Sequence, residues 1–292
     1  MGTRSNRRLR ASSISIIATA FAILGIGDSW ANPAAFTTLD RTALGSHVSG
    51  DLAFSFQDRP GGFGAQQVDL TSLRLDVRAH WVNRKGDLGA FLHLPVSAVF
   101  VSDRFSGLDD KFTLANIEAG GLYIIRERSF DIVFRGGIAL PTAGDDFASQ
   151  TANFSASYSR LTDFALAFPN TTWLRASASI LGGRPRGLYW RVDAGVDVPV
   201  SEPNNVDLDP LLRVNAGVGY RLRRVAVMGE LVNLINSDLG PQNDDMTHTL
   251  AITARSYHFK VVPSVGIVLP IDSTLRNIGF DFGFTIGLRG RL

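Results

Sequence analysis

The chain has 292 residues and no cysteine, and 45% of its residues are hydrophobic. An exported protein of this composition is held together without disulfide bonds. Four of the 29 basic residues and one of the 27 acidic residues lie in the first 31 positions, which leaves 25 basic and 26 acidic residues beyond them. This near balance gives no support to a nucleic-acid partner.

The first 31 residues have the three parts of a secretory signal peptide. Arg4, Arg7, Arg8 and Arg10 form a basic region, residues 11–27 are apolar, and Ser29-Trp30-Ala31 fits the small-x-small cleavage rule. An uncleaved membrane anchor is the alternative, but the apolar run is shorter than the roughly 20 residues that a spanning helix needs. We therefore expect export through the general secretory pathway, cleavage after Ala31, and a mature domain over residues 32–292.

Beyond residue 31, hydrophobic and polar residues alternate in twelve segments, which predicts strands with one apolar and one polar face. The segments are 44–57, 71–82, 87–100, 113–125, 130–141, 171–181, 188–200, 210–222, 225–235, 247–255, 259–270 and 278–289. Lengths near ten residues suit strands that cross a bilayer at a tilt. In the last segment we expect Phe280, Phe282, Phe284 and Ile286 to face lipid. No apolar run in the mature part approaches helix-spanning length, which excludes a helical membrane protein.

The links between these segments are alternately short and long. The short links are residues 83–86, 126–129, 182–187, 223–224 and 256–258, and the long ones are 58–70, 101–112, 142–170, 201–209, 236–246 and 271–277. Short periplasmic turns, longer external loops and an even strand count are typical of outer-membrane barrels. In the longest link we expect Tyr158 to Phe168 to form a short helix over or inside the mouth. The predicted fold class is all-β: a transmembrane antiparallel up-and-down β-barrel of about twelve strands, integral to the outer membrane of a Gram-negative bacterium.

The distribution of charge separates this barrel from a soluble β-sandwich, which also alternates. The long links carry 15 acidic and 5 basic residues, and the short ones 8 basic and 1 acidic. The remaining charges lie on polar faces or at segment ends, and none lies on an apolar face. A charge at the bilayer midplane costs roughly 2–4 kcal/mol on the lipid side of a barrel. The apolar faces are therefore expected to face lipid.

The polar faces supply candidate lumen-lining residues of both signs. They are Arg74, Asp76, Arg78, Glu118, Arg135, Arg175, Arg191, Asp193, Arg213, Arg221, Glu230 and Asp281. One interpretation is a pore lining whose opposed charges filter small polar or anionic solutes. The other is a ladder of structural ion pairs that fills a narrow lumen, since twelve strands lie between filled eight-stranded barrels and open porins. Glycines on the same faces, among them Gly120, Gly137, Gly195, Gly219 and Gly283, predict some water-filled space.

Signals for catalysis, metals or cofactors are poor. None of the five histidines, His47, His80, His93, His248 and His258, sits in a His-x-x-x-His or His-Glu pair. Outer-membrane phospholipases place a histidine and a serine on the outer wall, whereas His80 and His93 are expected to point inward. We therefore expect no enzyme and no cofactor.

Acidic pairs in the long links are candidate divalent-cation sites, because calcium and magnesium prefer oxygen ligands. These residues are Asp109, Asp110, Asp145, Asp146, Asp244 and Asp245. Bound cations would bridge the loops to lipopolysaccharide phosphates. Solvated loop tips are the alternative interpretation.

Two hairpins carry a family resemblance. Residues 113–146 include a strand that ends Gly121-Leu122-Tyr123, a tight turn, and a second strand that leads into Leu140-Pro141-Thr142-Ala143-Gly144-Asp145. Residues 215–222 with Glu230-Leu231 form the other. Both resemble hairpins of the outer-membrane transporter family of the MetA pathway of phenol degradation, although Ala143 interrupts that family's Pro-Thr-Gly. The resemblance implies a barrel concerned with hydrophobic or aromatic small molecules.

These sequence patterns are compatible with three functions. The first is an outer-membrane channel or transporter for small solutes, the second is a structural or surface-binding barrel with a charge-filled lumen, and an outer-membrane lipid hydrolase comes third. The expected partners are outer-membrane lipid, lipopolysaccharide, the barrel assembly machinery and a small-molecule solute.

Overall fold

The computed structural model describes residue 38 and residues 44–59, 68–101, 110–183, 186–201, 208–235 and 246–291. The expected signal peptide, residues 1–31, lies outside the described residues. The strands are β1 (His47–Arg59), β2 (Val68–Val82), β3 (Leu88–Val101), β4 (Lys111–Leu114), β5 (Glu118–Arg126), β6 (Phe130–Ala139), β7 (Thr172–Gly183), β8 (Gly187–Ser201), β9 (Leu211–Arg221), β10 (Val225–Ile235), β11 (Met246–Ser256), β12 (Val262–Pro270) and β13 (Phe280–Arg291). The helical segments are α2 (Phe147–Ser157), the 3-10 segment η2 (Tyr158–Ala167) and α3 (Ser273–Asn277).

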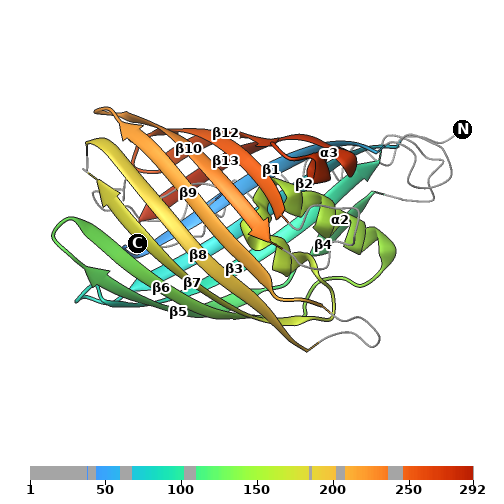
Figure 1. Ribbon diagram of the computed structural model, residues 1–292, viewed down its shortest axis with the longest axis horizontal. Coiled ribbons are helices and arrows are strands. Elements are labelled where there is room, and N and C mark those ends of the chain that lie inside the picture. The colour runs from blue at the N-terminus through green and yellow to red at the C-terminus, as the bar shows by residue number, and fades with distance from the viewer. Residues whose placement is uncertain are drawn as a thin grey trace, which may run out of the picture.

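The strands close into a barrel in which the paired strands are antiparallel (Figure 1). β1 pairs with both β2 and β13, which joins the first part of the chain to the last. β4 and β5 both pair with β3, so together they occupy one strand position, bent at residues 115–117. The wall therefore has twelve strand positions, and the predicted twelve-stranded antiparallel barrel is confirmed.

Alternation of side chains explains why these segments form a wall with a polar inside and an apolar outside. On β9, Leu212, Val214 and Val218 are exposed, whereas Arg213 and Asn215 between them are buried. Since successive side chains of a strand point to opposite faces, the exposed apolar rows form the outer surface. Such a continuous apolar surface is stable against lipid and unfavourable against water.

One strand departs from this alternation at its first residues. The register between β1 and β13 shifts between Phe56, which pairs with Phe282, and Gln57, which pairs with Phe280. A bulge of this kind turns the residues beyond it to the other face. Phe282 and Phe284 are exposed outside as expected, but the expectation that Phe280 faces lipid is wrong, because Phe280 is fully buried inside.

The link of residues 142–170 enters the barrel and forms a plug, which we define as α2 together with η2. Figure 1 shows α2 within the barrel, towards the end that also carries α3. α2 packs on β1 to β4, and η2 packs on β1, β10 and β13. The predicted helix at residues 158–168 corresponds to η2, while α2 before it was not foreseen. Among the described residues, no helix has both the length and the apolar character to cross a membrane.

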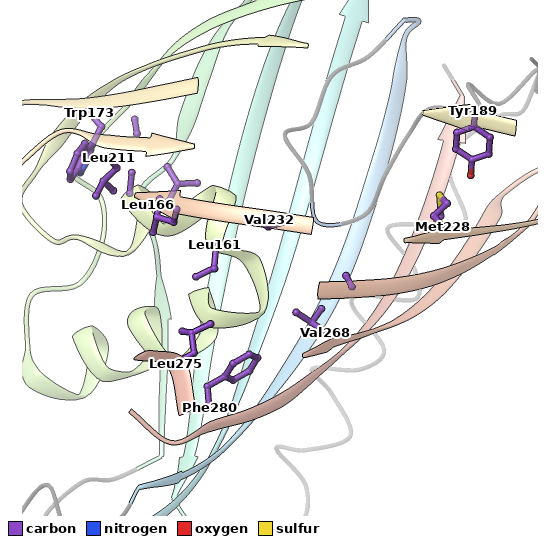
Figure 2. Close-up of a cluster of buried hydrophobic side chains, with 14 of the residues drawn as sticks. Leu161, Leu166, Trp173, Tyr189, Leu211, Met228, Val232, Val268, Leu275 and Phe280 are labelled. Carbon is purple, nitrogen blue, oxygen red and sulfur yellow. The ribbon is translucent and has the colours of Figure 1, made fainter. Parts of the chain in front are cut away.

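Apolar side chains anchor the plug to the inner wall (Figure 2). Leu161 and Leu166 of η2 lie in one buried cluster with Trp173, Leu211 and Phe280 from three strands. A second buried cluster, further towards the end with the short turns, consists of Phe91, Leu122, Ile124, Val133 and Leu181. Full burial of a large apolar side chain contributes about 1.5–3 kcal/mol, so the plug is a fixed part of the fold.

Candidate functional site

The candidate functional site is the charged lumen around the plug. Among the described residues, eight arginines and seven carboxylates are buried there. The buried members of the predicted lumen set are Arg74, Asp76, Arg78, Glu118, Arg135, Arg175, Arg191, Asp193, Arg213 and Glu230. Arg221 is half-buried, with its guanidinium 3.9 Å from the centre of the Tyr257 ring. The prediction that Asp281 lines the lumen is wrong: Asp281 is exposed, because it lies at the bulge between Phe280 and Phe282.

Asp163 of η2 lies at the centre of the charged groups. Its Oδ2 is 3.7 Å from Arg74 and 3.8 Å from Arg78, both on β2, and its Oδ1 is 3.6 Å from Arg175 on β7. Arg175 also donates to the backbone carbonyl of Thr162. Asp163 thus places a negative charge of the plug beside arginines of β2 and β7, two strands that are not neighbours in the wall.

Asp76 of β2 is the second focus of the network. Its carboxylate accepts a hydrogen bond from Arg74 at 3.0 Å and forms ion pairs with Arg78 and Arg160, each also at 3.0 Å. His93 Nε2 lies 2.7 Å from the same carboxylate. Asp76, His93 and Asp163 together place three ligand atoms within 4.8 Å of one another, as a metal site would. The surrounding arginines already compensate both carboxylates, so this cluster is an ion-pair centre and not a favourable cation site.

Glu118 of β5 joins Arg135 of β6 and Arg175 of β7 to the same network. Its Oε2 lies 2.8 Å from Arg135 and 2.7 Å from Arg175. The Arg135 guanidinium lies 4.0 Å from the centre of the Phe91 ring, a cation–π geometry. Glu118 and Arg135 therefore link the ionic layer to the second apolar cluster.

The network continues along β7, β8 and β9. Asp197 accepts from Arg175 at 3.1 Å and from Arg213 at 2.7 Å, and Arg191 pairs with Asp193 at 2.6 Å. Asp197 of β8 is held between arginines of β7 and β9, whereas Arg191 and Asp193 pair within β8. These pairs fix the relative positions of the side chains that line the lumen.

A separate set of hydrogen bonds joins Thr38, which precedes β1, to the lumen. Thr38 is buried, and its backbone N–H and hydroxyl donate to Glu230 of β10 at 2.5 and 2.6 Å. Thr162 of η2 donates to the carbonyl of Thr38 at 2.9 Å, and Thr253 donates to Glu230 at 3.2 Å. Sequence reasoning assigned no role to Thr38, since a single polar residue before the first strand carries no periodic signal.

The inward glycines do not leave the predicted empty space. A Cβ added at Gly120 or Gly137 would lie 2.8 Å from the Phe91 ring, and one at Gly219 would lie 2.3 Å from the Tyr189 ring. At Gly195 the nearest atom belongs to Arg213, at 2.9 Å. These glycines make room for large neighbouring side chains, so the expectation of water-filled space beside them is wrong at these positions.

The acidic loop residues have partners within the chain where they are described. Asp110 accepts from the backbone of Val101 at 3.1 Å, and Asp146 accepts from Ser149 and lies 3.0 Å from the Lys111 ammonium. Asp145 accepts from Asn170 at 3.4 Å. Asp109, Asp244 and Asp245 lie outside the described residues. Divalent-cation binding at these loops stays a prediction.

Some charges attributed to loops lie elsewhere. Arg160 and Asp163 belong to the link of residues 142–170, yet both are buried in the lumen.

His80 and His93 are buried as well, and His80 stacks on His47 with ring centres 4.5 Å apart. The inward position of both histidines differs from the outer-wall position that a lipid hydrolase uses.

Comparison with solved structures places this architecture among outer-membrane barrels. The COG4313 outer membrane channel from Pseudomonas putida F1 is 12% identical, with a TM-score of 0.62 over 90% of this chain and 100% of that one. The NanC porin is 6% identical, with a TM-score of 0.51 over 83% of this chain and 100% of that one. The translocator domain of the autotransporter NalP from Neisseria meningitidis is 9% identical, with a TM-score of 0.50 over 97% and 98%.

At these identities the likeness is one of fold alone. No family model matches the chain, and no curated protein matches it either. The resemblance to the transporter family of the MetA pathway is therefore not confirmed.

Proposed function

We propose that this protein is an outer-membrane channel for small polar solutes, in which the plug narrows the lumen. The observation that carries the proposal is the layer of buried charges around Asp163, to which β2, β5, β7 and the plug all contribute. The likeness to an outer membrane channel and to a porin is in keeping with it.

The cost of burying charge is the main argument. Replacing buried ion pairs by packed apolar residues is often neutral or stabilising, so ion pairs are a poor means of filling a barrel. A lumen that served only to hold the wall together would be expected to be apolar. The eight arginines and seven carboxylates buried in the lumen, by contrast, would offer partners of both signs to the charged or hydroxylated groups of a passing molecule.

Hydrophobic or aromatic solutes, which the family resemblance implies, are a less suitable cargo for this layer. Such a solute would separate buried charges from their partners without offering hydrogen bonds in return. We therefore propose polar solutes, with mixed charge or many hydroxyl groups.

A closed structural barrel is the second candidate. The observation that favours it is the occupation of the glycine spaces by Phe91, Tyr189 and Arg213. In both candidate functions the protein lies in the outer membrane, with its apolar wall against lipid. We also propose that the barrel assembly machinery inserts it.

Osmotic swelling of vesicles tests the channel. Vesicles that contain the purified protein should swell in glycine or a monosaccharide faster than protein-free vesicles, and more slowly as solute size increases. Swelling no faster than that of protein-free vesicles would contradict the channel and favour the closed barrel.

We also propose export through the general secretory pathway, on the strength of residues 1–31. N-terminal sequencing of protein from the membrane fraction should begin at Asn32. A first residue of Met1 would contradict cleavage.

A further inference from the structure

A groove of about 860 Å³ crosses the outer wall over β3, β5, β6, β7 and β8. Its floor consists of the small residues Gly121, Gly136, Ala176, Ala178 and Ala194. Large exposed side chains border it, namely Leu88, Tyr123 and Phe134. Because these residues belong to the apolar face of their strands, the groove lies within the part of the wall that faces lipid.

The residues of the groove lie in rows of opposite residues on neighbouring strands, and these rows start at one rim of the barrel. Leu88 pairs with Tyr123 and Tyr123 with Phe134. Phe134 then pairs with Ala178, and Ala178 with Ala194. Leu88 is the first residue of β3, whereas Ala194 lies in the middle of β8. The groove therefore begins at the rim with the short turns and ends near mid-wall.

The dimensions suit one hydrocarbon chain. Five strands about 4.8 Å apart give the groove a length of about 19 Å. With strands tilted by roughly 40°, this row rises by about 12 Å, most of the roughly 15 Å of hydrocarbon in one leaflet.

The rim where the groove begins is basic. The turn before Leu88 carries Arg84 and Lys85, β5 ends at Arg126, and the turn after β5 carries Arg128, all of them exposed. Arg126 donates to the carbonyls of Gly86 at 3.2 Å and Leu44 at 2.9 Å, which ties the two turns together beside the groove. Cations in this position attract phosphate headgroups.

We propose that this groove is a phospholipid site of the inner leaflet of the outer membrane. One acyl chain lies over Gly121, Gly136 and Ala176, and the phosphate lies at Arg84, Lys85 and Arg128. The proposal rests on insertion of the barrel in a membrane and does not depend on conduction through the lumen.

Gly136→Leu tests the site because it fills the groove without straining the wall. A Cβ added at Gly136 meets no atom within 4 Å, and the same holds for Gly229 on β10. Gly229 lies between the exposed residues Val227 and Leu231, outside the groove, so Gly229→Leu is a matched control. Ala176→Leu provides a second way to fill the groove.

The measurement is native mass spectrometry of barrels refolded in phosphatidylglycerol vesicles and then extracted in mild detergent. The wild type and Gly229→Leu should retain a bound phospholipid. Gly136→Leu and Ala176→Leu should bind about tenfold less, a ratio that corresponds to about 1.4 kcal/mol. Equal retention by all four proteins would overturn the proposal.

Two further measurements test the role of the phosphate headgroup and the possibility that a second copy of the chain occupies the groove. Diacylglycerol, which lacks the phosphate, should bind less than phosphatidylglycerol, and equal binding would overturn the role of the basic rim. If Gly136→Leu dissociated a dimer in sedimentation without changing the bound lipid, the groove would be an interface between copies and the lipid site would be wrong. None of these measurements depends on solute flux, so a barrel that does not conduct leaves this test unaffected.

Discussion

Asp163 is a residue through which the plug joins the charged network of the lumen. It is buried on η2 and lies within 4 Å of Arg74, Arg78 and Arg175. Nothing in the sequence around Tyr158 to Phe168 distinguishes this aspartate from a solvated loop residue. Its role follows from the packing of the plug against β10 and β13, which local periodicity does not determine.

Asp163→Asn should lower the free energy of unfolding by about 3 kcal/mol, because it leaves arginines buried with less compensating charge. Asp145→Asn, an exposed neighbour on the same link, should change it by less than about 0.5 kcal/mol. Urea unfolding of both variants in lipid vesicles measures the difference. Equal effects would show that Asp163 is solvated and the charged layer is not as compact as described.

A substitution on the outer face of β13 tests which side chains face lipid. Phe284 is exposed on β13 between Phe54 and Ile267 of the neighbouring strands. Phe284→Arg should destabilise the barrel by roughly 2–4 kcal/mol in lipid, as a charge near the midplane does. Asp281→Asn should be mild, because Asp281 is already exposed near the rim. The assignment of faces would be contradicted by a larger effect of Asp281→Asn in the same vesicle unfolding assay.

The sequence predicted the outward faces of Phe282, Phe284 and Ile286 correctly, but it placed Phe280 and Asp281 on the wrong faces, since Phe280 is buried and Asp281 is exposed. Alternation with period two extends a face indefinitely, and a bulge that inverts it leaves no mark in composition. The inversion becomes visible only in the pairing of β13 with β1.

At the element scale, the plug is the part of the fold that sequence predicted least well. η2 carries apolar residues that indicate a helix, but α2 is rich in Ser, Thr, Asn and Ala and has no apolar stripe. Small side chains of this kind pack closely against β1 to β4 inside the lumen. A helix inside a barrel does not need the amphipathic pattern of a surface helix, since it is enclosed on several sides.

The start of α2 depends on Asp146, whose side chain accepts from the Ser149 backbone at 3.0 Å and from its hydroxyl at 2.6 Å. These hydrogen bonds and the Lys111 ammonium lower the pKa of Asp146 from 3.8 to about 2. Because the folded-state pKa is the lower one, the stabilisation is complete above about pH 4 and is lost as the pH falls towards 2. Asp146→Ala should increase amide exchange in residues 147–150 at pH 7, as the loss of an N-cap does.

Amide protection measured by mass spectrometry tests this cap, with intrinsic exchange rates corrected for pH. In the wild type, protection of residues 147–150 should be constant between pH 7 and 4 and should decrease below. Asp145→Ala is the control, since Asp145 contacts Asn170 and does not cap α2. Unchanged protection in Asp146→Ala would show that burial alone holds the helix.

At the scale of the whole molecule, sequence was sufficient for the number, direction and approximate length of the strands. Twelve alternating segments determine a closed barrel because each strand is long enough to cross the membrane and each needs two neighbours. The sequence did not predict which charges pair in the lumen, since partners such as Glu118 and Arg175 are far apart in the chain. Which side chains fill the spaces at the glycines was equally inaccessible.

Ion selectivity depends on the loops in this account. The buried charges nearly balance, whereas the long links, without the buried Arg160 and Asp163, carry 14 acidic and 4 basic residues. Any current should therefore favour cations at about 10 mM salt, where the Debye length is about 30 Å, and lose the preference near 1 M. Replacing Asp109, Asp110, Asp244 and Asp245 together by Asn should shift the reversal potential towards zero. Anion preference at low salt would instead assign selectivity to the buried arginines.

Passage of solutes through a lumen narrowed by the plug can be measured as the current through single molecules in a planar bilayer. Purified full-length protein should produce discrete conductance steps. Replacing residues 147–167 by a short Gly-Ser linker should enlarge those steps, because it removes α2 and η2 from the path. Folded, inserted barrels that give no steps either with the plug or without it would contradict the channel.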